Sequence, residues 1–252
     1  MENQWQLYRV QLINWGTFDG VSEAYFANDF ENAAVTVISG GSGTGKSTLQ
    51  DAYDEIMMRA PRFNDASNVG GRGAGSGFGS GKRTLHTYAR GMLDSVYDEA
   101  AGAEVARVLR DNSCSRWTAI SASFVDALGD YFTAAKLYYL TSECDFVDGS
   151  NTKFVTSNEL LDLSVLSQVA DRKFDKRSIE KVLPNARQHN SRSEFLNCVY
   201  RSLSIGSEDQ GQALMELLAR IRSGKDFKTV SALFNELVLE RPHTYERADK
   251  AL

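Results

Sequence analysis

The sequence of 252 residues contains few of the residues that build disulfide frameworks and metal sites. Its three cysteines are Cys114, Cys144 and Cys198, and its three histidines are His86, His189 and His243. The cysteines are odd in number and form no C-x-x-C pair, so the spacing indicates neither a disulfide framework nor a zinc site. The histidines lie far apart without partnering ligands, which favours packing or surface positions. We expect a reducing cytoplasm.

Long hydrophobic runs and excess positive charge are also missing. No apolar run approaches the roughly 20 residues of a membrane-spanning helix, and the first residues, MENQWQLYRV, lack the pattern of a signal peptide. The net charge of −5 disfavours a broadly basic nucleic-acid surface, while a local basic site stays open. A hydrophobic content of 42% and a charged content of 24% are typical of a globular protein with one large domain or two small ones.

The most informative stretch is residues 34–58, AVTVISGGSGTGKSTLQDAYDEIMM. The β-branched run at 35–38 predicts a buried strand, which leads through a glycine-rich turn into a helix. The motif G-x-x-x-x-G-K-[ST] is matched by Gly40, Gly45, Lys46 and Ser47. This strand, loop and helix are the context that a phosphate-binding loop requires.

Each residue type in this loop suits the binding of a nucleotide triphosphate. Glycines let successive backbone N–H groups curl around phosphate, and the start of the helix directs its positive end at the same group. Lys46 supplies a mobile positive charge, and the hydroxyl of Ser47 is a hard oxygen ligand for Mg²⁺. We expect ATP and Mg²⁺ as ligands. The candidate nucleotide-binding residues are Gly40, Gly41, Ser42, Gly43, Thr44, Gly45, Lys46, Ser47 and Thr48, with Ser47 as the Mg²⁺ ligand.

Patterns elsewhere predict further strands and helices. Alternating residues predict strands at 5–13 and 24–26, and a hairpin formed by 116–125 and 131–140. The helix after the phosphate loop should end before Pro61, and another helix is expected over 84–96. From residue 157 onward, the apolar residues recur at the spacing of a helix. Capping boxes at Ser191-x-x-Glu194 and Ser207-x-x-Gln210, and a cap at Asp226, predict the starts of three helices.

Seven glycines between Gly70 and Gly81 set residues 64–83 apart. Such a stretch cannot offset its ordering entropy by burial, so we expect a mobile surface loop. The alternative is a loop that becomes ordered over nucleotide or DNA, with Arg72, Lys82 and Arg83 contacting phosphate.

No convincing Walker B carboxylate is present. The apolar run 137–140 is followed by Thr141 and Ser142 instead of Asp-Glu, and Asp126 is followed by Ala127. The catalytic residues are therefore unknown, and we do not expect the chain to hydrolyse ATP alone.

Several other residues have two readings. Trp15 and Phe18 could approach the base or ribose, or could pack beneath the sheet. Arg90 and Arg59 could reach phosphate or DNA, although solvated helix arginines are the simpler reading. The charged stretch 171–181 mixes both signs, which is typical of a solvated face.

Four stretches together resemble the N-terminal head segment of SMC-like ATPases. These are residues 12–18 (LINWGTF), the phosphate loop with Leu49-Gln50-Asp51-Ala52, residues 63–66 (FNDA) and residues 83–91 (RTLHTYARG). The similarity is greatest to the MukB-like JetC subunits of Wadjet anti-plasmid systems. The stretch at 213–249 also resembles the part of those proteins that leads into their long coiled coil.

This resemblance implies an ABC-type head that binds ATP·Mg²⁺ and dimerises around two nucleotides. In that family, cycles of head engagement and hydrolysis drive DNA loop extrusion with kleisin and winged-helix subunits, and a nuclease subunit cuts plasmid DNA. Ser42 and Thr44 stand where many relatives have Asn and Ser, which should not abolish phosphate binding. The signature motif and Walker B of the family lie beyond a coiled coil and hinge, so the chain resembles half a head. Its final residues, YERADKAL, resemble the start of a helix that is cut off.

We therefore predict an α/β P-loop fold of the ABC/SMC head type, with a mixed sheet that has an antiparallel β portion. Residues 1–150 would form the nucleotide-binding lobe and residues 151–252 a helical portion that leads toward a coiled coil. The predicted function is ATP binding within an SMC-like complex that acts on DNA, in chromosome organisation or anti-plasmid defence. A second head half, kleisin, winged-helix subunits and DNA are the expected partners. The alternatives are a self-contained P-loop NTPase or small-molecule kinase, and a truncated protein that only binds partners.

Overall fold

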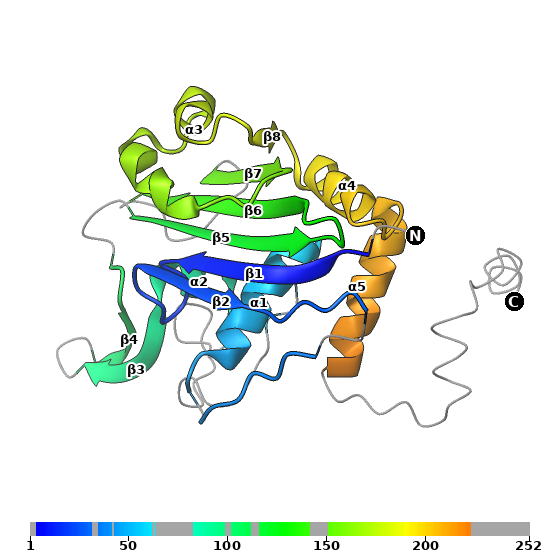
Figure 1. Ribbon diagram of the computed structural model, residues 1–252. Helices are drawn as coiled ribbons and strands as arrows, with labels where there is room; N and C mark the ends of the chain where they lie inside the picture. Colours follow the sequence, from blue (N-terminus) through cyan, green and yellow to red (C-terminus); the bar gives the residue numbers. More distant parts are fainter. Residues whose placement is uncertain are drawn as a thin grey trace, which may run out of the picture.

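A six-stranded antiparallel sheet forms the centre of the protein (Figure 1). The computed structural model describes residues 4–31, 35–41, 43–61, 63, 83–98, 102–111, 116–141 and 151–222. In spatial order the strands are β2 (Val21–Tyr25), β1 (Gln6–Ile13), β5 (Arg116–Val125), β6 (Tyr131–Leu140), β7 (Thr152–Ser157) and β8 (Arg187–His189). A separate hairpin of β3 (Met92–Asp98) and β4 (Ala103–Val108) extends away from this sheet.

Helices lie on both faces of the sheet, which gives three layers of α/β type. One face packs against α1 (Lys46–Met57) and α4 (Arg192–Ser202), and the opposite face against the 3₁₀ helix η2 (Leu163–Arg172) and α3 (Lys176–Val182). Two further helices are α2 (Leu85–Arg90) and α5 (Glu208–Arg222). Because successive strand residues point to opposite faces, β1 directs Val10 and Leu12 to the α1 side and Ile13 to the η2 side.

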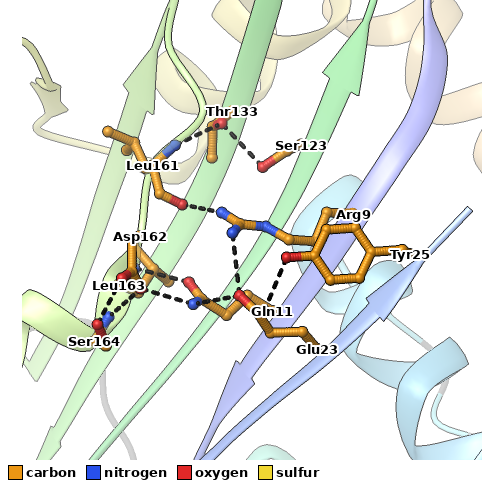
Figure 2. A network of polar contacts seen from close by, with 10 residues as sticks. All are labelled: Arg9, Gln11, Glu23, Tyr25, Ser123, Thr133, Leu161, Asp162, Leu163 and Ser164. Atoms are coloured by element: carbon orange, nitrogen blue, oxygen red, sulfur yellow. Dashed lines mark hydrogen bonds and ion pairs between the residues drawn. The ribbon is translucent and has the colours of Figure 1, made fainter.

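Polar side chains join β1 to the segment that leads into η2 (Figure 2). Arg9 donates to Glu23 Oε1 at 3.1 Å and to the carbonyl oxygen of Leu161. Gln11 donates to Asp162 Oδ1 at 2.8 Å, and its own Oε1 accepts the backbone N–H of Leu163 at 2.7 Å. Since Arg9 and Gln11 are buried, the bonds satisfy polar atoms that burial would otherwise penalise. They attach the η2 layer to the sheet.

Most strands expected from alternation are confirmed. β1 matches residues 5–13, β2 covers 24–25, and the hairpin of β5 and β6 has the predicted limits. β7 and β8 were not predicted, and they continue the same sheet beyond residue 150. Every strand pairing among the described residues is antiparallel.

The strand expected before the phosphate loop is not formed, so that prediction was wrong for this chain. Residues 35–41 carry no strand, and Val35, Val37 and Ile38 are 77%, 81% and 49% exposed. A strand needs a neighbouring strand to pair its backbone N–H and C=O groups, and an apolar one also needs covering layers. No such pairing reaches this run within the described residues.

The helix expected over 84–96 is much shorter. α2 ends at Arg90 because Gly91 adopts a left-handed conformation, with φ +67°, and the chain continues as β3. Glycine has no Cβ to oppose that conformation, so it terminates helices readily. Residues 92–96, which we expected to continue the helix, belong to β3.

Both predicted capping boxes begin helices. Ser191 Oγ accepts the N–H of Glu194 at the start of α4, and Ser207 and Gln210 exchange two hydrogen bonds at the start of α5. The cap at Asp226, the loop at 64–82 and the residues after 222 lie outside the described ranges. Within those ranges, no helix is both long and apolar enough to cross a membrane.

Candidate nucleotide-binding site

The phosphate loop leads directly into α1. This helix begins at Lys46, and the preceding glycines Gly43 and Gly45 have φ values of +82° and +91°. Such angles favour glycine and bring consecutive backbone N–H groups to one side of a turn. The N-cap residue of α1, Gly45, has no side chain that could accept a hydrogen bond from the first turn. The first-turn N–H groups, with the positive end of the helix dipole, therefore suit an anionic ligand.

Lys46 folds back over the loop. Its Nζ donates to the carbonyl oxygens of Gly40 and Gly41 at 2.7 and 2.6 Å, and lies 3.3 Å from Thr44 Oγ1. The Thr44 hydroxyl in turn donates to the carbonyl of Gly41 at 3.0 Å. The ammonium is thus held above the loop, where it can approach a phosphate. Ser47 is half-buried in the first turn of α1 and could supply an oxygen to Mg²⁺.

An aromatic stack supports the first turn of α1. Trp15 is fully buried, lies parallel to the ring of Tyr88 with centroids 4.8 Å apart, and donates from Nε1 to the carbonyl of Thr48 at 3.2 Å. Phe18 packs against the loop itself, because a Cβ added to Gly45 would lie 2.6 Å from its ring. Trp15 therefore has the packing role, and Phe18 lies beside the phosphate loop.

Arg110 fixes the turn that carries these aromatic residues. Its guanidinium donates to the carbonyl oxygens of Gly16, Tyr88 and Ala89 at 2.7, 3.1 and 2.8 Å. The side chain is buried, and burial lowers the pKa of Arg110 to about 10. An arginine in this state is still protonated at neutral pH and can satisfy several carbonyls at once.

A second buried group joins α1 to α2. Tyr88 donates its hydroxyl proton to Asp51 Oδ2, and Arg83 lies 3.5 Å from the same carboxylate oxygen. Burial and the neighbouring Asp51 raise the pKa of Tyr88. Phe63 packs on Tyr88, with ring centroids 5.2 Å apart. The two described residues that flank the glycine-rich segment, Phe63 and Arg83, therefore meet at Tyr88.

The other arginines that we singled out serve the fold. Arg90 is fully buried and donates to the carbonyls of Asp111 and Thr141, so both readings made from the sequence were wrong. Arg59 is half-exposed and forms an ion pair with Glu208. Arg83 pairs with Asp51 of α1. The charged residues of 171–181 are exposed, as predicted.

His189 and Asp126 also have structural surroundings. His189 shares a hydrogen bond with Thr156 at 2.8 Å, and burial lowers its pKa. Among the described residues, no group of three or more His, Cys, Asp or Glu side chains could hold a metal ion. Asp126 accepts the N–H groups of Leu128 and Asp130, so it shapes the turn between β5 and β6.

The sequence did not reveal the buried residues that support α1, the helix that follows the phosphate loop. Asp51, Tyr88 and Arg110 come from α1, α2 and the end of the β3–β4 hairpin, and no short motif links them. Tyr88 lay within a stretch that carried the family resemblance, but nothing there indicated its contact with Asp51. Ser42 lies outside the described ranges, and the remaining proposed nucleotide-binding residues lie directly before α1 or in its first turn.

Comparison with known proteins supports this site. Residues 7–70 match the family described as the P-loop containing region of AAA domain, a segment that runs from β1 through the phosphate loop and α1. No curated protein sequence matches the chain. The geometry of the loop and this similarity together support a P-loop NTPase region that binds nucleotide.

Proposed function

We propose that the chain is the ATP-binding N-terminal head segment of an SMC-like ATPase that acts on DNA, close to the JetC subunits of anti-plasmid systems. The observation that carries the proposal is the phosphate loop, with Gly43 and Gly45 at positive φ and Lys46 at the start of α1. Lys46 would contact the β- and γ-phosphates, and Ser47 would bind Mg²⁺. The metal would neutralise phosphate charge.

The exposure of the apolar run at 35–38, before the phosphate loop, is an argument that the chain is only part of a head. Val35 and Val37 are 77% and 81% exposed, although their pattern is that of a buried strand. A second head half would bring strands and a covering layer to this run. The same half would provide the carboxylates that we did not find in the sequence. The kleisin, winged-helix and DNA partners are part of the proposal through the family resemblance.

The experiment is a titration of Mg·ATP onto the purified chain, comparing the wild type with Lys46→Ala. Loss of a charged hydrogen-bond donor costs about 1.5–3 kcal/mol, so we expect ATP binding roughly 10- to 100-fold weaker in the variant. Lys176→Ala is the matched control, because this lysine is 75% exposed and has only a 4.0 Å ion pair with Glu180. Unchanged ATP affinity in Lys46→Ala would contradict the assignment.

Phosphate release from the same samples separates the proposal from a self-contained enzyme. Binding without turnover in the wild type is the expected result for a head segment that needs a second half. Rapid turnover by the chain alone would favour a self-contained P-loop NTPase or kinase.

A further inference from the structure

The C-terminal end of α1 is held by side chains from two other elements. The last four carbonyl groups of a helix have no partner within it. Here Lys136 of β6 donates to the carbonyl of Glu55, and Tyr200 of α4 to that of Met57. Arg192, also in α4, donates to the carbonyl of Arg59 at 2.6 Å, just beyond the helix. The end of α1 opposite the phosphate loop is therefore fixed to both the sheet and α4.

The carboxylate of Glu55 contacts three side chains at this end of α1. Its Oε1 lies 3.2 Å from Lys136 Nζ, 2.9 Å from Tyr138 Oη and 2.8 Å from Arg192 Nη2. Lys136 and Tyr138 are fully buried, and Glu55 is 1% exposed. Two cations thus face one carboxylate at the negative end of the helix dipole, which favours positive charge. The dipole offsets the excess positive charge of the cluster.

A fully buried lysine is costly unless its charge is paired. Lys136 Nζ lies over the rings of Phe154 and Phe195, at 5.7 and 5.6 Å from their centroids. Burial lowers its pKa to about 8. An apolar residue would fill this position more cheaply, but it could not donate to the carbonyl of Glu55. The placement favours a role in holding α1.

α5 reinforces the same attachment. Arg59 donates its backbone N–H to Gln212 Oε1 at 2.9 Å and forms an ion pair with Glu208. Gly211 allows α5 to approach closely, because an added Cβ would lie 2.3 Å from the ring of Tyr200. Figure 1 shows α4 and α5 together at one end of the sheet.

We propose that Lys136, Tyr200 and Arg192 are positioning residues for nucleotide binding, which hold the C-terminal end of α1 and so fix the direction of its phosphate-binding end. The inference rests on the proposed ATP binding. A helix of this length spans about 18 Å, so a tilt of about 5° at one end displaces the other by roughly 1.5 Å. That displacement would separate the first-turn N–H groups and Ser47 from a bound phosphate.

The test measures Mg·ATP affinity in the wild type, Lys136→Met and Tyr200→Phe, each checked for folding by its urea midpoint. We expect ATP binding about tenfold weaker in Lys136→Met and about threefold weaker in Tyr200→Phe, which corresponds to roughly 1.4 and 0.7 kcal/mol. Tyr200→Phe removes one oxygen and keeps the packing, so it tests the proposal even if Lys136→Met does not fold.

Gln11→Met is the matched control. Gln11 is also buried and hydrogen-bonded, but it joins β1 to the η2 layer on the opposite face from α1 (Figure 2). We expect this variant to lose stability and keep the wild-type ATP affinity. An equal loss of affinity in Gln11→Met at equal loss of stability would show a merely structural role and overturn the inference.

A pH profile provides a second readout. The titratable groups that face Lys136 are Glu55 of α1, Tyr138 of β6 and Arg192 of α4. Because the pKa of Lys136 is about 8, its positive charge at the end of α1 is lost between about pH 7 and 9. Wild-type ATP affinity should fall two- to threefold there, relative to Lys136→Met, and a parallel profile in both proteins would contradict the proposal. A wild type that binds no ATP would overturn the proposed function as well, whereas equal binding by wild type and variants would overturn only this inference.

Discussion

Arg110 shows how one buried side chain can support the phosphate loop without contacting it. It joins the carbonyls of Gly16, Tyr88 and Ala89, which belong to the turn after β1 and to α2. The same turn carries Trp15, which bonds to the first turn of α1. The three carbonyls need the planar fork of a guanidinium, because a single ammonium cannot reach all of them.

We predict that Arg110→Lys lowers the free energy of unfolding by about 2–4 kcal/mol, since it leaves at least one buried carbonyl without a donor. Urea unfolding of the purified chain measures the change. Arg116→Lys is the matched control, because Arg116 is 40% exposed and lies 3.8 Å from Asp111. Exposed ion pairs contribute little, so the control should change stability by no more than about 0.5 kcal/mol. Equal losses in the two variants would refute the assigned role of Arg110.

At the residue scale, the phosphate loop could be predicted and its supports could not. Lys46 and Ser47 belong to a short motif whose chemistry is local. Arg90, Arg110 and Lys136 are charged residues that a sequence reading places at the surface, where most such residues lie. Their burial depends on carbonyl groups brought close by distant parts of the chain, such as that of Glu55 for Lys136.

Among the elements, the junction between α2 and β3 depends on one glycine. Gly91 has φ +67°, and an added Cβ would lie 2.7 Å from the backbone oxygen of Gly16. Gly129, in the turn between β5 and β6, has φ +87° but no atom within 4 Å of an added Cβ. Both positions therefore have a left-handed backbone conformation, but only at Gly91 would an added Cβ collide with neighbouring atoms.

We predict that Gly129→Ala costs about 1 kcal/mol through the left-handed conformation alone, while Gly91→Ala costs about 2–4 kcal/mol because the backbone must also move. Urea unfolding of both variants gives the difference directly. Similar losses would mean that the contact with Gly16 is relieved without cost.

Elements whose signals lie within a few residues were predicted well. The turn held by Asp126 joins β5 to β6, and the caps at Ser191 and Ser207 start α4 and α5. β7 and β8 were missed because their pairing with β6 and with one another joins residues that are distant in sequence. The run at 35–38 has the composition of a strand, but composition does not supply the neighbours that a strand needs.

At the scale of the whole molecule, two apolar segments with strand-like sequences differ in burial: one lies in β1, and the other is the run at 35–38. Val10 of β1 is 1% exposed between β2 and β5, with α1 above it. Val37 is 81% exposed and precedes the phosphate loop. The antiparallel sheet is thus covered on both faces, while the run that leads to the proposed nucleotide site is not.

We predict that Val10→Ala lowers the free energy of unfolding of this chain by about 1–3 kcal/mol, since it opens a cavity in a packed core. Val37→Ala, the same chemical change, should alter stability by no more than about 0.5 kcal/mol. Paired urea unfolding curves measure both. A loss in Val37→Ala as large as that in Val10→Ala would mean that residues 35–38 are already buried in the isolated chain, and the argument for a missing covering half would fail. Equal behaviour is not expected, because only Val10 has neighbouring strands on both sides and a helix over its side chain.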